Sequence, residues 1–353
     1  MPPRISPGGF LDWIDFQSEE FVCMKESKEK YLEFCQKIYV PLFSKPWWMD
    51  AMCGADNWDV WLCENNGRID AAMPYFQTIR DEKTYITKAK LTQNNGIIFN
   101  QLPTSKQATK SAFEERVINQ ACDFIKSKGL DVYEQQFHFS FTNWLPFYWQ
   151  GYTAMPRYTF VIEHSKSIDT IWDGISSKTR GIIRKGAKNS YFDYSLGKDE
   201  FYREHEKVFI KQNMACPFSY DEWCRLYDAC IDHQCGQIIC ARDINTHRVA
   251  SVIFLVWDEE SAYHLLGGSI PEFQNLDTYE ALIWEAIKFT YDKKLRYDFE
   301  GSVIKRIAKS FREFGATPYC YFRIRKVFNP DILREECESS IKALSRLNFN
   351  SRK

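Results

Sequence analysis

Two acids and a set of basic residues lie within twenty residues of one another in the last fifth of the chain. The segment Arg296–Ser302 reads as a strand that carries Asp298 and Glu300, and a helical pattern follows it up to Gly315. Residues two apart on a strand project from the same face, so we expect the two carboxylates side by side, with the pKa of one raised by the other. Such a pair can take a proton from an attacking nucleophile.

A histidine joins the two acids in the candidate site, and each of these residues can also be explained by a purely structural role. His264 lies on an expected strand, where it serves either as a base or as a buried histidine of the core. The acids have a structural reading as well, in which Arg296 or Arg323 holds one of them in an ion pair. The candidate catalytic residues are Asp298, Glu300 and His264.

Basic residues gather on two expected helices. One helix follows the acids and has its basic residues at spacing i, i+4, i+7, opposite an apolar face, and the other spans residues 177–188. Each basic face either binds an anion such as a phosphate or is simply solvated. The candidate contacts to an anion are Lys305, Lys309, Arg312, Arg180 and Arg184.

A polar turn between an expected strand and an expected helix gives one more candidate binding site. Asn275, Asp277 and Thr278 are residue types that begin helices. The first backbone amides of a helix are free to bind a phosphate or a carbonyl oxygen. Asn275 and Thr278 therefore join the candidate ligand-binding residues.

The composition excludes several classes of protein. The chain has 353 residues, of which 44% are hydrophobic and 26% charged, so we expect two folded domains rather than disorder. A net charge of -1 argues against a protein that coats nucleic acid, and DNA is not an expected partner. The sequence shows neither a signal-peptide pattern nor a long apolar run, so we expect a cytoplasmic protein without a transmembrane segment.

The twelve cysteines are expected to be reduced and mostly buried, because no regular disulfide spacing appears. Cys230, His233, Cys235 and Cys240 fall within eleven residues. The first of these segments looks helical and the last looks like a strand, and the spacing does not match that of zinc ligands. We therefore expect packing thiols and no metal.

Two regions of the chain, 58–151 and 238–315, carry the same order of elements. Each begins with a hairpin, continues with a helix that feeds an acidic strand, and ends with a short aromatic helix, a glycine and a last strand. Over twenty-one residues the register holds one offset of 166, which aligns Glu114 with Glu280 and Glu134 with Glu300. The repeat predicts a duplicated α/β unit whose copies are joined by residues 152–162.

This order of elements resembles that of the GNAT acyltransferases, and two such units in tandem resemble the FemABX and CelD/BioF-like acyltransferases. In the second half, Ser177–Lys188 is similar to the basic helix that opens the domain, Tyr263–Ser269 to its central strand, and Tyr297–Ser302 with Phe311–Gly315 to its closing motif. The resemblance implies an α/β (α+β) fold of two tandem GNAT-like domains, each a mixed, mostly antiparallel sheet flanked by helices. The expected division is 1–155, 156–335 and a C-terminal tail, 336–353.

The resemblance also implies an activity, the transfer of an acyl group to an amine by direct attack. Arg312 matches the basic position of the family near the donor phosphate. The expected donor is acyl-CoA, with aminoacyl-tRNA as the alternative. The expected acceptor is a small-molecule, lipid or peptide amine, and contact with tRNA or with a membrane surface stays open.

The sequence departs from the family pattern at two places. Residues 270–278 lack the glycine-containing phosphate loop, and residues 186–202 are too few for the long helical arm of some peptidoglycan enzymes. The first copy has Tyr148 where the second has Arg312, which shows how a copy can lose its basic residue. A non-catalytic binding protein on the same fold is therefore the third hypothesis.

Overall fold

The first expected hairpin forms as the sequence predicts. In the computed structural model, which describes residues 26–210 and 214–350, β1 (Trp58–Asn65) pairs antiparallel with β2 (Arg68–Arg80). Asn66 and Gly67 make the turn with φ angles of 50° and 77°. This left-handed conformation is the one that a two-residue hairpin turn requires, and asparagine and glycine adopt it most easily.

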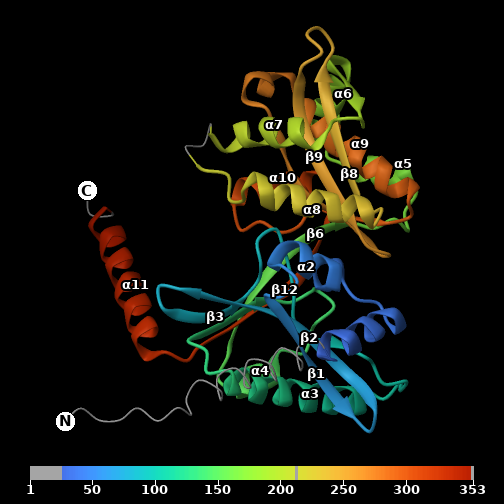
Figure 1. The fold of residues 1–353 in the computed structure, drawn as a ribbon. Coiled ribbons are helices and arrows are strands. Elements are labelled where there is room, and N and C mark those ends of the chain that lie inside the picture. The colour runs from blue at the N-terminus through green and yellow to red at the C-terminus, as the bar shows by residue number, and fades with distance from the viewer. Residues whose placement is uncertain (1–25, 211–213, 351–353) are drawn as a thin grey trace, which may run out of the picture.

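All strands of the described chain belong to one sheet. The remaining strands are β3 (Lys83–Thr87), β4 (Ile98–Phe99), β5 (Val132–Gln136), β6 (Thr153–Ile162), β7 (Ser190–Asp193), β8 (Gly236–Asp243), β9 (Val249–Trp257), β10 (Ser261–Ser269), β11 (Arg296–Asp298) and β12 (Thr317–Val327). Their order is β1-β2-β3-β5-β12-β6-β11-β10-β9-β8-β7, with β4 paired to β2. Figure 1 shows that this sheet runs through two lobes, with β6 and β12 between them.

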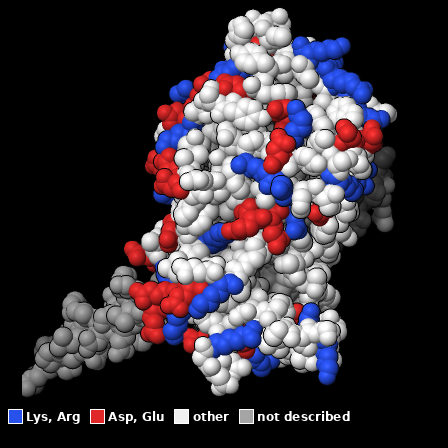
Figure 2. Space-filling model, turned by 90° about the vertical axis from the view of Figure 1, so that its right-hand side faces the viewer, with Lys and Arg blue, Asp and Glu red and all other residues white. Residues whose placement is uncertain are grey.

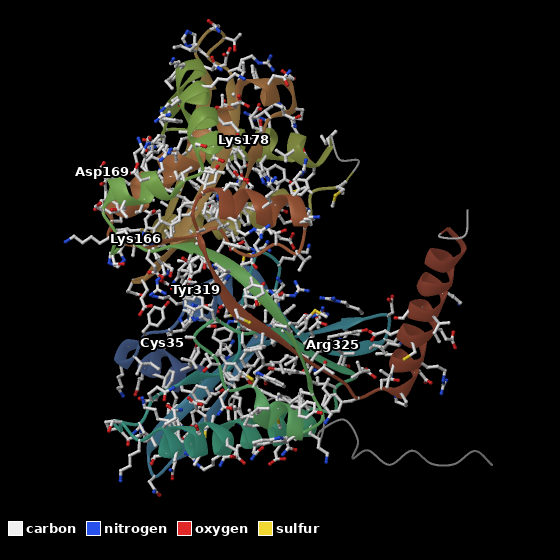
Figure 3. The ribbon with its side chains drawn as sticks, turned by 180° about the vertical axis from the view of Figure 1, so that it is seen from behind. Cys35, Lys166, Asp169, Lys178, Tyr319 and Arg325 are labelled. Atoms are coloured by element: carbon white, nitrogen blue, oxygen red, sulfur yellow. The ribbon has the colours of Figure 1, made fainter. Side chains whose placement is uncertain are left out.

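The two copies of the repeat exchange their last strands. β6 ends the first copy but pairs with β11 of the second, and β12 ends the second copy but pairs with β5 of the first. β6 and β12 also pair with each other, from Thr317 opposite Val161 to Arg325 opposite Thr153. In Figure 3 the two strands run together from one lobe into the other, with Tyr319 and Arg325 labelled along β12. Residues 153–162 therefore join the copies as a central strand rather than as a linker.

Helices cover both faces of the sheet. Residues 26–37 are helical, and the other helices are α2 (Pro46–Cys53), α3 (Gln107–Ser127), α4 (Leu145–Trp149), α5 (Ile168–Gly174), α6 (Ser177–Asn189), α7 (Lys198–Ile210), α8 (Tyr220–Asp232), α9 (Thr278–Asp292), α10 (Lys305–Glu313) and α11 (Pro330–Asn350), with short 3-10 helices η1 (Leu42–Ser44) and η2 (Pro271–Leu276). In the second half, Phe201 of α7 and Trp223 of α8 pack with Phe254 of β9. Leu282 of α9 packs with the neighbouring Leu255, which points to the opposite face.

The predicted repeat is confirmed element by element. Phe113 and Val117 of α3 are buried, as are Ile283 and Ile287 of α9, so both helices use an i, i+4 apolar stripe to pack on the sheet. β3 pairs parallel with β5, and β10 pairs parallel with β11. The short helices α4 and α10 are followed by Gly151 and Gly315, whose φ angles are 78° and 77°, and each leads into an exchanged strand.

The cores of the two halves are interleaved. Leu42 and Trp48, from the first quarter of the chain, are buried in the same core as Trp223 of the second half. The rings of Phe43 and Tyr263 lie 4.9 Å apart across this contact. Because chain segments and packing cross between the halves, the expected domain boundaries near residues 155 and 335 stay a prediction.

The C-terminal helix stands apart from both lobes. α11 extends outward beyond β12 (Figure 1), so residues 336–350 of the expected tail continue a helix. Its first turns are held by an ion pair of 2.5 Å between Arg325 and Glu336 and one of 3.4 Å between Lys83 and Glu335. These contacts link α11 to β12 and β3.

Reduced cysteines were expected, and the eleven cysteines within residues 26–210 and 214–350 are free thiols. Over the same residues, no group of three or more His, Cys, Asp or Glu side chains is placed to hold a metal ion. The segments around Cys230 and Cys240 form a helix and a strand, as predicted. Among the described helices, none is long and apolar enough to cross a membrane.

Exchange of the last strands makes β12 part of the core of the first half. Ile324 is fully buried there, beside Tyr133 of β5. We expect Ile324→Ala to lower the free energy of unfolding by about 2–5 kcal/mol, the usual cost of removing a buried Ile side chain. Hydrogen exchange should show lost protection in β5, although the mutation lies near the end of the chain.

Urea unfolding measures this loss, and Leu333→Ala is the matched control because Leu333 is 51% exposed in α11. The control should change stability by no more than about 0.5 kcal/mol. A loss below about 1 kcal/mol for Ile324→Ala, or protection lost only in β8 and β9, would contradict the exchanged pairing.

Candidate active site

Asp298 lies at the last residue of β11, where this strand separates from β10. The parallel ladder between the two strands covers only three pairs and ends with Tyr263 opposite Asp298. Oδ1 of Asp298 accepts hydrogen bonds from Oγ1 of Thr159 and, at 2.7 Å, from the backbone N–H of Glu300. The side chain is 3% exposed, and burial raises its pKa to about 6 although these hydrogen bonds oppose the rise.

Glu300 does not lie on the strand, so the prediction that both acids project from one strand face is wrong. β11 ends at Asp298, whose carboxylate accepts the N–H of Glu300 and draws the chain into a turn. Glu300 adopts a left-handed φ of 58°. Its Oε2 accepts a hydrogen bond from Nε2 of Gln93, and its buried Oε1 has no partner. Burial, and next the charge of Asp298, raise its pKa well above the ordinary value.

The alternative in which an arginine neutralises one of these acids is not what the structure shows. Arg296 donates to Glu260 at 2.8 Å, and Arg323 pairs with Glu134 in β5. Both acids nevertheless line one cavity. The pair is therefore a buried cluster of two carboxylates whose charged form is disfavoured.

This cavity is built by both halves of the chain. It has a volume of about 30 Å³. The first half contributes the loop before β4 and the residues after β5, β6 and β12 contribute Thr159 and Tyr321, and the second half contributes Tyr263 and the acids. Gly301 also lines it, and a Cβ there would collide with the carbonyl oxygen of Tyr158, so the chain can leave the acids only through glycine.

His138 is a wall residue that sequence reasoning missed. It is 9% exposed, its Nδ1 lies 2.8 Å from Oγ of Ser140, and its buried Nε2 has no partner. Burial, and next the charge of Arg296, lower its pKa to about 4, so the ring is neutral near pH 7. The sequence around it offers no motif, because only the exchange of β6 and β12 brings the end of β5 to the end of β11.

His264 lies on the other face of the sheet. It neighbours Tyr263, and successive residues of a strand point to opposite faces. Its Nδ1 is 2.7 Å from the hydroxyl of Tyr297, and its Nε2 is 3.1 Å from that of Tyr279. Burial lowers its pKa to about 3. The grouping of His264 with the two acids is therefore wrong, and its geometry is that of a core histidine with both nitrogens bonded.

The basic residues of α10 are exposed and lie on the same side of the sheet as His264. Phe311 of this helix packs against Phe160 and Phe299, with ring centroids 5.7 and 4.7 Å apart. α10 begins at Lys305, and the apolar residues Val303 and Ile304 lie before it and are exposed. The three residues of the expected basic stripe are Lys305, Lys309 and Arg312.

α6 is the second basic helix, and its two predicted residues have different surroundings. Arg180 lies within 3.5 Å of carbonyl oxygens at the end of α5 and pairs with Asp173 at 3.4 Å, which is a structural role. Arg184 is exposed and lies over the ring of Trp172 at 5.3 Å. Figure 2 shows Lys and Arg gathered toward the upper edge of the molecule, with acidic groups interspersed elsewhere.

The predicted helix start at residues 275–278 is confirmed, because α9 begins at Thr278. The side chain of Asp277 does not cap the helix but pairs with Lys185 of α6 at 2.6 Å. Asn275 is exposed, whereas Thr278 is buried and its hydroxyl has no partner. The structure does not bring these residues to the cavity of the acids, since they lie at the opposite end of β10 from its pairing with β11.

Burial of Asp298 predicts a dependence of stability on pH. Its pKa rises on folding from 3.8 to about 6, so the folded state binds the proton more tightly and stability falls as pH rises through this window. Asp298→Asn removes this cost. Relative to the native chain, the variant should gain stability between pH 4 and 7, by up to about 3 kcal/mol.

Chemical denaturation at several pH values measures the gain. Asp292→Asn is the control, because Asp292 is exposed at the end of α9. Its stability should depend on pH as that of the native chain does. A difference between Asp298→Asn and the native chain that is constant from pH 4 to 7 would mean that Asp298 titrates normally.

Comparison with known proteins gives information on the fold and on one domain. Residues 184–314 match the family model of the acetyltransferase (GNAT) domain. Among solved structures, the chain is similar to FemX, with a TM-score of 0.61 at 11% identity over 83% of this chain and 94% of that one. It is also similar to a conserved protein of unknown function from Bacteroides thetaiotaomicron, with a TM-score of 0.50 at 8% identity over 80% of this chain and 88% of that one. The search of curated proteins gave no match.

At such low identities the structural similarity shows the fold alone. The family model matches only residues in the second half of the chain. Together they confirm the predicted tandem arrangement of GNAT-like units in a mixed α/β fold. Residues 184–314 therefore match an acetyltransferase (GNAT) domain, within a chain whose overall fold is similar to that of FemX.

Proposed function

We propose that the protein is an N-acyltransferase that moves an acyl group from acyl-CoA to an amine by direct attack. The observation that carries the proposal is the buried pair Asp298 and Glu300 at the point where β10 and β11 separate. A split between two parallel strands leaves backbone groups without a strand partner, and the acids stand at the apex of this split. The proposed location is the cytoplasm, where acyl-CoA is available.

The two carboxylates suit the acceptor amine. An amine arrives mostly as an ammonium ion, and the unpartnered Oε1 of Glu300 can accept one of its N–H groups. With a pKa of about 6, Asp298 is ionised near pH 7 and still basic enough to accept a proton. The amine lone pair then forms the C–N bond, the C–S bond of the thioester breaks, and the thiolate takes up a proton.

The open edge of β10 suits the acyl donor. Beyond Tyr263 this strand continues to Ser269 but faces no strand on the side of β11. Backbone N–H groups on such an edge can donate to the thioester oxygen as negative charge develops on it. α10 lies on the other side of the sheet from the acids, where Arg312 with Lys305 and Lys309 would hold the donor phosphates.

An aminoacyl-tRNA donor is the second candidate, and the surface of α6 favours it. Lys178, Arg184 and Lys188 are exposed on this helix, and η2 stands where a glycine-rich phosphate loop would be. A broad basic surface fits a tRNA acceptor end better than one pyrophosphate. A non-catalytic binding role is the third candidate, and an absence of turnover with either donor would favour it.

Turnover separates these candidates. The purified chain is incubated with acetyl-CoA or longer acyl-CoA and a panel of amines, and free CoA and the amide are followed by mass spectrometry. We expect CoA release that depends on the amine. Turnover with aminoacyl-tRNA alone would select the second candidate.

Asp298→Asn tests the base. We expect kcat/KM to fall by about 10²–10⁴, the usual contribution of a general base. In the native chain, kcat/KM should rise with pH to a plateau above about pH 6, and this rise should be lost in the variant. Asp292→Asn should keep native activity, and equal activity of Asp298→Asn would remove Asp298 from the mechanism.

Arg312→Ala tests the donor site. Loss of a charge-assisted contact to a phosphate should raise the KM for acyl-CoA about tenfold and leave the KM for the amine unchanged. Arg306→Ala is the matched control, because Arg306 is also exposed on α10 but lies outside the i, i+4, i+7 stripe. Equal donor KM values for the two variants would contradict the assignment.

A further inference from the structure

A second, larger cavity opens in the first half of the chain. It has a volume of about 460 Å³, which is within the range of small-molecule sites. Its walls come from the segment between residues 38 and 44, the extended segment from residue 94 to residue 101, and the residues after β5. We call it the amide cleft, because Asn94, Asn95, Asn100 and Gln101 line it.

The amide cleft adjoins the cavity of the acids. Asn94 and His138 belong to the walls of both. A molecule in the cleft therefore lies next to the cavity that Asp298 and Glu300 line. The smaller cavity, of about 30 Å³, has room for a group the size of a water molecule or an amino group.

Three of the side chains that line the amide cleft carry a buried polar atom without a partner. Oδ1 of Asn94, Oδ1 of Asn95 and Nε2 of His138 are buried and unpaired. Asn95 is 3% exposed, and its Nδ2 donates to the carbonyl oxygen of Phe43 at 2.8 Å, so the orientation of its amide is fixed. Leaving such atoms unpaired costs about 1–3 kcal/mol each.

The tautomer of His138 defines the kind of group that fits. The backbone N–H of Ser140 points at Nδ1 of His138 at 3.3 Å, so Nδ1 accepts and the neutral ring carries its proton on Nε2. The side chains that line the cleft thus carry two unpaired acceptors, on Asn94 and Asn95, and one unpaired donor, on His138. Hydroxyl and amide groups can serve both kinds of partner.

The walls of the amide cleft carry no charge. None of its fifteen lining residues is Asp, Glu, Lys or Arg. Ile97, Ile98 and the parallel rings of Phe99 and Phe141, 6.0 Å apart, supply its apolar surface. A phosphate or carboxylate would lose its hydration here without gaining a counter-ion, and this excludes a nucleotide from the cleft.

We propose that the amide cleft binds the acceptor of the acyl transfer and that this acceptor is a primary amine on an uncharged, polar body, such as an amino sugar or a peptide amide. The body occupies the cleft and bonds to Asn94 and Asn95. Its amino group passes His138 and reaches the carboxylates of Asp298 and Glu300. This inference rests on the proposed function for the role of the amine, whereas binding in the cleft stands by itself.

Binding without any acyl donor is the first test. Saturation-transfer NMR on the full chain compares glucosamine, glycyl-glycinamide and glucosamine 6-phosphate. We expect at least one of the two neutral-bodied amines to bind, and the phosphate to weaken binding of the sugar at least tenfold. The two neutral probes distinguish a sugar from a peptide as the source of the same groups. No binding of either one, or tighter binding of the phosphate, would overturn the proposal.

Filling the cleft is the second test. Ile98→Trp and Gln101→Trp place an indole in its wall and at its rim, and Ile79→Trp is the control because Ile79 is 71% exposed in β2 outside the lining. Circular dichroism identifies folded variants. Either folded cleft variant should weaken binding at least tenfold, and unchanged binding in both would overturn the proposal.

Kinetics separate this inference from the proposed function. If Ile98→Trp or Gln101→Trp raises the amine KM about tenfold with the acyl-CoA KM unchanged, both hold. If the cleft variants transfer the acyl group with an unchanged amine KM, the proposed role of the cleft is wrong and the proposed function stands. If instead the native chain binds the amine but transfers no acyl group, and the cleft variants abolish this binding, the proposed activity is wrong and the binding site stands.

Discussion

The ladder between β6 and β12 is the interaction on which the rest of the structure depends. Each strand ends one copy of the repeat and pairs with the other copy, and nine residue pairs join them to each other. The backbone hydrogen bonds of this ladder join segments that are far apart in the sequence, so no local pairing can replace them. The two halves therefore share one sheet, and neither can complete its own sheet without the last strand of the other.

The same ladder creates the candidate site. β5 and β11 lie on its two sides, so the residues after β5 and the residues after β11 reach one end of the sheet together. Phe139 and Tyr319 touch there, with ring centroids 5.2 Å apart. His138 and Asp298, which lie 160 residues apart in the sequence, become walls of one cavity. A site of this kind exists only in the fully folded chain, which explains why it can hold groups that are costly to bury.

Much of the fold followed from local patterns in the sequence. The Asn66–Gly67 turn, the apolar stripes of α3 and α9, and the glycines after α4 and α10 each have a local physical cause, and each appeared as predicted. The site followed less well. Asp298 and Glu300 do share a cavity, but Glu300 leaves the strand because the carboxylate of Asp298 captures its backbone N–H.

The misplaced histidine has a similar explanation. The alternation of side chains along a strand places His264 on the face opposite to Tyr263. The sequence alone does not show which of the two faces carries the acids. His138 gave no signal at all, because its partners come from the other copy of the repeat through exchanged strands. Pairings between distant segments, rather than local conformation, are what the sequence did not reveal.

The two copies differ in what surrounds the acid at the aligned position. Glu134 of the first copy pairs with Arg323, and Arg325 lies 3.1 Å away, so its charge is compensated by β12. Glu300 of the second copy accepts a hydrogen bond from the amide of Gln93 and keeps one buried oxygen unpaired, and the charge of Lys88 only partly opposes the rise of its pKa. The carboxylate of Glu134 is engaged in ion pairs, whereas burial and the neighbouring Asp298 raise the pKa of Glu300. The alignment of the two glutamates therefore reflects the shared fold, and the difference in their partners gives only the second copy a carboxylate pair able to accept a proton.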